Sequence, residues 1–338
     1  MTWQERRTVT ILSTILLILC AALLIVLGIR YQQNRDLPDV EDAEAVPGAV
    51  TDPGAFTSLY YENGSTTLSF SLNEAGAWVW DVDADFPLDD ATITAITELL
   101  ASWKPQQTIT DSATLEDCGM DKPTATLTAG TAQGGAVTML LGKATIDGSS
   151  YYMRYNGDET TAYIIDGGLY ALLCVPIYDM CKLPELPRLT ADAIQSVIIR
   201  GAAQGEETQG VTTVLAAQRT EGETGVTTWR SSGANVTDDE TVQALLGDLE
   251  SLAFERCVDY RPSDEAASIC GFDTPAAELA VEYVTDTGVE QTLDLTIGNP
   301  LPDGSGRYAR LGEDTTIYLL PTAALDPLMR VSVNGLEG

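Results

Sequence analysis

Residues 118–123 read CGMDKP and residues 270–275 read CGFDTP, so the two stretches are identical at four of six positions. A tryptophan precedes each stretch, Trp80 in the first case and Trp229 in the second. We infer one unit of roughly 130 residues that occurs twice, and a unit of this size is expected to have its own core. Further segments match in the same order, namely 140–143 with 296–299, 151–154 with 307–310, and 162–165 with 317–320.

Each of the two stretches is predicted to end a short helix. The glycine tolerates the left-handed conformation that ends many helices, the proline keeps the helix from resuming, and the aspartate accepts hydrogen bonds from N–H groups of the turn. An apolar contact is expected between Met120 and Leu115 in the first unit, and between Phe272 and Ala267 in the second. The predicted structural residues are Gly119, Asp121, Pro123, Gly271, Asp273 and Pro275.

Two amphipathic segments, 93–103 and 242–252, are predicted helices because their apolar residues recur at helical spacing. Thr237 and Glu240 form a capping-box pattern before the second segment. Short alternating segments separated by glycine-rich turns predict antiparallel strands. The fold class is therefore predicted as α+β, with two tandem antiparallel sheets and helices on one face of each. The predicted strands are 66–72, 77–81, 124–129, 136–141, 150–155, 161–165, 196–200, 211–217, 226–230, 277–283 and 292–297.

Acidic residues dominate the charge of this 338-residue chain, with 50 Asp and Glu against 18 Lys and Arg and a net charge of −32. Such a field repels phosphate backbones, so nucleic acid is not an expected partner. Histidine is absent, which removes the commonest general base and metal ligand. Phosphate-loop, dinucleotide-binding and nucleophile-elbow motifs are absent as well. We predict that the protein is not an enzyme, and we assign no catalytic, cofactor-binding or metal-binding residue.

The N-terminal segment 8–29 is apolar and uncharged, and it is predicted to be an uncleaved membrane anchor. Its length as a helix is roughly 33 Å, enough to cross a bilayer core. Arg6, Arg7 and the amino terminus favour a cytoplasmic tail at 1–7, which places the later domains outside the cytoplasm. The remaining predicted segments are an acidic, proline-containing linker at 30–57, repeat unit 1 at 58–187 and repeat unit 2 at 188–335.

Three aspartates begin a pattern that is typical of a calcium loop. Asp81, Asp83 and Asp85 have the spacing D-x-D-x-D. Phe86 stands at the sixth position, where such a loop needs glycine. Two interpretations stay open, either a weak calcium site or a solvated strand that leads into a helix N-terminus.

The cysteines leave several arrangements open. Cys118 and Cys270 are interpreted as small buried apolar residues, because the sequence places neither a base nor a second metal ligand beside them. Cys174 with Cys181, and Cys257 with Cys270, are the pairs proposed for disulfides outside the cytoplasm. Buried free thiols are the alternative for all of them.

Matched strand positions carry an arginine and a tyrosine in both units. They are Arg154 with Tyr152 in the first, and Arg310 with Tyr308 in the second. Either they form a recognition surface, or they are cross-strand partners on a solvent-facing side of the sheet. Both interpretations stay open at this point.

The ordered set of motifs resembles an uncharacterised bacterial family, the one catalogued as domain of unknown function 4340. Its members are similar to this chain in a tryptophan-led strand, an amphipathic helix, a helix stop, and a strand series with glycine and tyrosine. The resemblance implies a membrane-anchored, extracytoplasmic protein, often encoded near ABC-type export or gliding-type transport components, and it carries over no catalytic residue. In this sequence the motifs are Trp80, 93–103, 119–123, 141–142, 151–154 and Tyr163, then Trp229, 271–275, 297–298, 308–310 and Tyr318.

Three functional hypotheses follow. The first is a non-enzymatic, single-pass accessory protein whose two extracytoplasmic domains bind an ABC-type permease or ATPase, or its cargo. The second is a cell-envelope structural module that holds cations or wall polymers through its carboxylates. The third is a carboxylate-based enzyme, which the absence of histidine disfavours. The family resemblance favours the first hypothesis.

Overall fold

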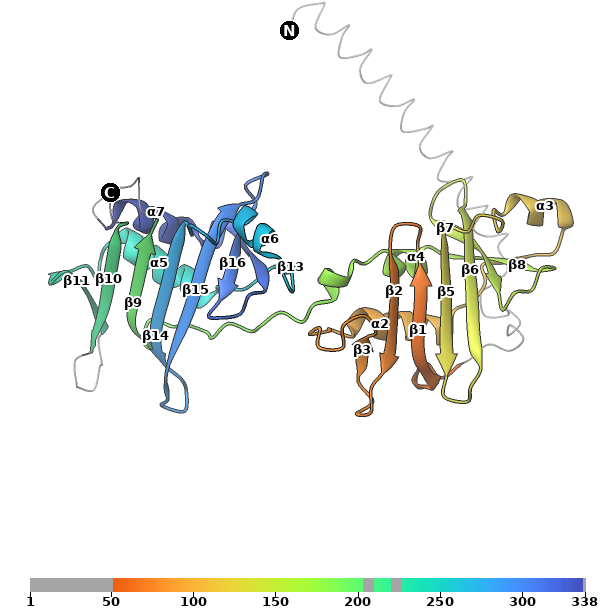
Figure 1. Ribbon diagram of the computed structural model, residues 1–338, viewed down its shortest axis with the longest axis horizontal. Helices are drawn as coiled ribbons and strands as arrows, with labels where there is room; N and C mark the ends of the chain where they lie inside the picture. Colours follow the sequence, from red (N-terminus) through yellow and green to blue (C-terminus); the bar gives the residue numbers. More distant parts are fainter. Residues whose placement is uncertain (1–50, 203–209, 220–226, 337–338) are drawn as a thin grey trace, which may run out of the picture. The chain divides into compact units, whose positions relative to one another are not determined.

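The computed structural model describes residues 51–202, 210–219 and 227–336 (Figure 1). Within these ranges, no helix has both the length and the apolar character needed to cross a membrane. The predicted tail and anchor, and the linker up to residue 50, lie outside the described residues. Two compact units are present, one containing Thr97–Tyr170 and the other containing Thr57–Ile96 with Ala171 onward. The predicted boundary between the repeat units at 187 and 188 stays a prediction.

The first repeat unit supplies an eight-stranded antiparallel sheet. Its strands are β1 (Phe56–Glu62), β2 (Thr67–Leu72), β3 (Trp78–Trp80), β4 (Gln107–Ile109), β5 (Ala125–Thr131), β6 (Ala136–Ala144), β7 (Ser150–Tyr155) and β8 (Ala162–Asp166). Their spatial order is β3-β2-β1-β5-β6-β7-β8-β4. Cross-strand pairs such as Tyr152 with Ile164, between β7 and β8, define the register.

The second repeat unit supplies a nine-stranded antiparallel sheet. Its strands are β9 (Ile194–Gly201), β10 (Thr212–Arg219), β11 (Thr227–Ser231), β12 (Ala234–Asn235), β13 (Arg256–Asp259), β14 (Ala277–Val284), β15 (Glu290–Pro300), β16 (Gly306–Leu311) and β17 (Ile317–Pro321). Their order is β12-β11-β10-β9-β14-β15-β16-β17-β13. Apart from the additional edge strand β12, the connectivity is the same as in the first sheet, as expected for a repeated unit.

Helices follow the strands at matching places in the two units. The predicted amphipathic segments form the long helices α2 and α5, which begin two residues earlier than predicted. Short 3₁₀ turns, η2 (Pro53–Ala55), η3 (Ile177–Met180) and η4 (Thr322–Ala324), lie in the connections. The α-helices of the described ranges are α2 (Ala91–Ser102), α3 (Ser112–Asp117), α4 (Gly168–Leu173), α5 (Glu240–Glu250), α6 (Asp264–Ile269) and α7 (Asp326–Asn334).

The start of α5 is capped by Asp239, so the predicted capping box of Thr237 and Glu240 is wrong. The Asp239 carboxylate accepts hydrogen bonds from the N–H groups of Thr241 and Val242, at 2.9 and 3.1 Å. The hydroxyl of Thr237 instead accepts a hydrogen bond from the N–H of Trp229 at 2.9 Å. Its place beside β11 makes it a partner of the sheet, and Asp239, two residues later, takes over the cap.

Strand alternation places one face of each sheet in a core. On β14, Leu279 and Val281 are buried, whereas Glu278 and Glu282 are exposed. Helix α7 packs against β9 and β10, and Leu245 of α5 belongs to the same core. The glutamates therefore lie on the face of the second sheet opposite α5 and α7.

Helices cover both faces of the first sheet, not one face as predicted. Trp103, directly after α2, contacts Tyr163 of β8 with 5.5 Å between the ring centroids. The neighbouring Ile164 points to the opposite face, where it packs with Met120 at the end of α3. The face next to α2 is already filled, so the apolar residues of the helix stop are buried on the other face.

Removing the α5 cap tests this assignment. We expect Asp239→Ala to lower the free energy of unfolding by about 1 kcal/mol, because two N–H groups lose their acceptor. Glu240→Ala is the matched control and should change it by less than about 0.5 kcal/mol. Urea unfolding of the full chain in detergent, followed by tryptophan fluorescence, measures both. A larger loss for Glu240→Ala would restore the predicted capping box.

Candidate functional site

The two helix stops have the same backbone geometry. Gly119 and Gly271 adopt φ values of +75° and +86°, a conformation that L side chains rarely adopt. At the end of α6, the Phe272 N–H donates to the carbonyl of Ala267 at 3.1 Å, which is the long hydrogen bond of a Schellman motif. At the end of α3, Leu115 packs in the apolar cluster that contains Met120.

The remaining predicted residues of the helix stops lie toward solvent. Asp121 and Asp273 are exposed, and Pro123 and Pro275 are half-buried. The backbone itself closes the turn after α3, since the N–H of Lys122 donates to the carbonyl of Gly119 at 3.4 Å. The prolines precede β5 and β14, and so they separate each stop from the next strand.

Each helix stop is hydrogen-bonded to a neighbouring strand. The Cys118 carbonyl accepts the N–H of Lys143 on β6 at 2.9 Å, and the Cys270 carbonyl accepts the N–H of Asn299 on β15 at 2.7 Å. The residue before each donor is glycine. A Cβ added to Gly298 would lie 2.2 Å from the Cys270 oxygen, a distance that real Cβ atoms essentially never show. The close approach therefore requires glycine at this strand position.

An arginine lies beside each helix stop. The guanidinium carbon of Arg310, on β16, lies 4.1 Å from the ring centroid of Phe272, a cation–π contact. Arg154 holds the matching position on β7, and the Nε atoms of both arginines are buried without a hydrogen-bond partner among the described residues. Both side chains are half-buried. One interpretation from the sequence made Arg310 a cross-strand partner on a solvent-facing side, and its stacking on Phe272 contradicts that interpretation.

The thiols of the helix stops are poorly suited to chemistry. Burial raises the pKa of the Cys118 and Cys270 thiols above the usual range, and the nearby Arg154 and Arg310 oppose this effect only in part. The thiolate is the reactive form of cysteine, so both residues are protonated and inert at neutral pH.

A cavity of about 540 Å³ opens beside the first helix stop. Leu115 and Met120 line its apolar part, and Arg154 also borders it. Ser112 and three acidic residues complete the lining, so the cavity offers an apolar surface, one cation and several carboxylates. The acidic residues are Glu116, Asp121 and Glu159.

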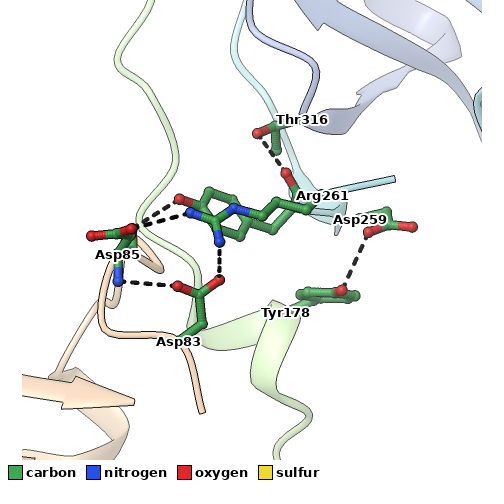
Figure 2. Close-up of polar contacts among 7 residues, drawn as sticks. Asp83, Asp85, Tyr178, Asp259, Arg261 and Thr316 are labelled. Atoms are coloured by element: carbon green, nitrogen blue, oxygen red, sulfur yellow. Dashed lines mark hydrogen bonds and ion pairs between the residues drawn. The ribbon is translucent and has the colours of Figure 1, made fainter. Parts of the chain in front are cut away.

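The D-x-D-x-D segment, which the sequence left open between a weak calcium site and a solvated strand, binds Arg261 of the same compact unit. Figure 2 shows Arg261 between the two carboxylates, with Nη1 2.8 Å from Asp83 Oδ2 and Nη2 3.3 Å from Asp85 Oδ2. Asp81 accepts a hydrogen bond from the Ser71 hydroxyl at 2.6 Å. Across the ranges that the structure describes, no three His, Cys, Asp or Glu residues are grouped to hold a metal ion. The three aspartates are thus divided between different partners.

The same segment is held by aromatic and polar contacts. Phe86, the residue that breaks the calcium pattern, is only 4% exposed and stacks edge-on against Trp80 and Tyr260. The Tyr260 hydroxyl donates to the carbonyl of Asp85 at 2.9 Å, and the Thr316 hydroxyl donates to the carbonyl of Tyr260 at 3.1 Å. A second contact nearby joins the Tyr178 hydroxyl to Asp259 at 3.2 Å (Figure 2). Phe86 serves as a packing residue where a metal loop would need glycine.

All five cysteines of the described ranges are free thiols. The structure brings together a pair that sequence spacing did not indicate: η3 packs against β13, and Cys181 and Cys257 share one buried cluster. A hydrogen bond from Cys257 lowers the pKa of Cys181 and raises that of Cys257. Cys174 is exposed. The disulfides Cys174–Cys181 and Cys257–Cys270, one of the two interpretations that the sequence left open, are not formed.

Comparison with known proteins identifies one family. The family model described as domain of unknown function (DUF4340) matches residues 78–173 and again residues 229–331. Each match covers one helix stop and its arginine, and together they span more than half of the chain. No curated protein and no solved structure matches the chain.

A glycine-to-alanine substitution, which adds one methyl group, tests the close approach of helix stop and strand. We expect Gly298→Ala to lower the free energy of unfolding by about 3 kcal/mol, because the new Cβ collides with a backbone oxygen. Gly247→Ala, in α5 of the same compact unit, is the control. Nothing lies within 4 Å of its added Cβ, so alanine should stabilise the helix by about 0.5–1 kcal/mol. Equal effects in urea unfolding would contradict the close approach.

Thiol reactivity gives a second test. Brief iodoacetamide treatment of the folded chain should modify Cys174 and leave Cys118, Cys181, Cys257 and Cys270 unmodified, because these four are buried. Treatment in urea should modify all five of these cysteines, and peptide mass spectrometry reads each site. Fast labelling of Cys118 or Cys270 in the folded chain would show an accessible, activated thiol and refute the inert assignment.

Proposed function

We propose that this chain, which belongs to the family of the domain of unknown function 4340, has a non-enzymatic binding role. The protein is a membrane-anchored accessory protein, and its two domains lie outside the cytoplasm and bind a component of an ABC-type transport complex. The predicted anchor at 8–29 supplies the attachment, and the acidic linker, predicted at 30–57 but ending before β1 begins at Phe56, separates the domains from the bilayer. The permease, the ATPase or the cargo is the partner.

The observation that carries this proposal is the repeated helix stop. A rigid backbone joint is built twice, and each joint holds a half-buried arginine at its surface. In the first unit a cavity with apolar and charged walls lies beside that arginine. Such a cavity is typical of a binding site, because apolar walls supply affinity and a few polar groups supply orientation.

Other features of the chain support binding more than catalysis. The sequence contains no histidine, and burial raises the pKa of the helix-stop thiols. In the acidic run that suggested a cation-binding module, Asp83 and Asp85 pair with Arg261, and Asp81 accepts a hydrogen bond from a serine hydroxyl. These pairings weaken the hypothesis of a carboxylate module for cations or wall polymers.

Co-purification from the native membrane tests the proposal. The tagged full chain is extracted in a mild detergent, and bound proteins are identified by mass spectrometry. We expect an ABC-type permease or ATPase in stoichiometric amount, and its loss when residues 58–330 are deleted while the anchor is kept. Recovery of the protein alone, or retention on purified wall material instead, would refute the transport role.

A further inference from the structure

The second repeat unit shows how a helix stop of this protein holds its arginine. Phe272 lies over Arg310, with 4.1 Å from the ring centroid to the guanidinium carbon. A ring in this position interacts with the cation through its π face and shields it from water. The second unit therefore supplies its own aromatic partner to its arginine.

The first repeat unit has the same scaffold but no ring at the equivalent position. Met120 corresponds to Phe272, and Arg154 corresponds to Arg310. The two side chains occupy equivalent places: the nearest Met120 carbon lies 3.2 Å from a Cβ added at Gly142, and the nearest Phe272 carbon lies 3.5 Å from one added at Gly298. A thioether has no π face to offer to a guanidinium.

Space for a ring is available at the first helix stop. The cavity of about 540 Å³ is bordered by both Met120 and Arg154, and Leu115 adds a further apolar wall. This volume lies within the range of about 300–1,000 Å³ that ligand pockets in proteins have. Methionine adapts its shape readily to an inserted group and makes favourable sulfur–aromatic contacts.

The charge around the cavity determines which kind of protein segment can bring an aromatic ring into it. Three exposed carboxylates border the cavity, and the whole chain has a net charge of −32. Such a field draws in a basic segment and repels an acidic one. The carboxylates belong to Glu116, Asp121 and Glu159.

From this comparison we infer that the cavity beside the first helix stop binds an aromatic side chain from a basic segment of a partner protein. The ring stacks on the guanidinium of Arg154, as Phe272 stacks on Arg310, and the flanking Lys or Arg residues face the three carboxylates. This inference rests on the proposed binding role and names the chemistry that the partner must present.

The test uses two labelled peptides of equal charge, acetyl-Lys-Lys-Phe-Lys-Lys-amide and acetyl-Lys-Lys-Ala-Lys-Lys-amide. Fluorescence anisotropy with the full chain in detergent should show at least tenfold tighter binding of the phenylalanine peptide. Met120→Phe should remove this preference, because the new ring fills the cavity in the manner of Phe272. Phe272→Met is the matched control in the other unit and should leave the tenfold preference in place.

A second variant tests the inference in case Met120→Phe does not fold. Arg154→Gln keeps a polar side chain at the same strand position but removes the cation, so the preference for phenylalanine should fall at least fivefold. Equal binding of both peptides to the natural chain would overturn the inference. So would an unchanged preference in Met120→Phe or in Arg154→Gln.

The outcome separates this inference from the proposed transport role. If an ABC-type component co-purifies equally with the natural chain and with Met120→Phe, the transport role stands and the aromatic site is refuted as its contact. If the peptides discriminate as expected but no transport component co-purifies, the site stands and the transport role fails.

Discussion

Each repeat unit depends on a hydrogen bond between the last turn of a helix and the backbone of a strand. The carbonyl oxygens of Cys118 and Cys270 accept N–H groups from β6 and β15 at 2.9 and 2.7 Å. A glycine beside each donor allows the two backbones to approach. This contact attaches the helix stop to the face opposite the main helices, and it places Met120 and Phe272 beside their arginines.

Local chemistry explains what the sequence predicted well. The repeat, the two helix stops and most strands were readable, because glycine, proline and alternating side chains act within a few residues. The short strands β4, β12 and β13 were missed, since two to four residues are too few for alternation to show. The inner strand β1 was missed as well, because its sequence FTSLYYE does not alternate strictly between apolar and polar residues. The distribution of helices over both faces was also missed, because it depends on which face of the sheet another helix has already filled.

Long-range partners explain what the sequence did not predict about the site. The D-x-D-x-D pattern suggested calcium, but Arg261, which pairs with Asp85, stands 176 positions further along the chain. Likewise, Arg310 was recognised as a matched strand residue, whereas its stacking on Phe272 follows only from the folded helix stop. Local patterns indicate which groups are present, and the topology decides which of them meet.

The attachment between helix stop and strand uses main-chain atoms, and this has an evolutionary consequence. After an internal duplication, the side chains around such a joint can change without loss of the joint itself. The two units illustrate this freedom, since Met120 and Lys143 in one correspond to Phe272 and Asn299 in the other. The second unit adds a side-chain bond from the Asn299 amide to the carbonyl of Ile269 at 2.9 Å, but the main-chain bond is the part that both copies share. A duplicated domain held by such a shared main-chain bond is free to divide tasks, one copy closing its surface while the other adapts to new ligands.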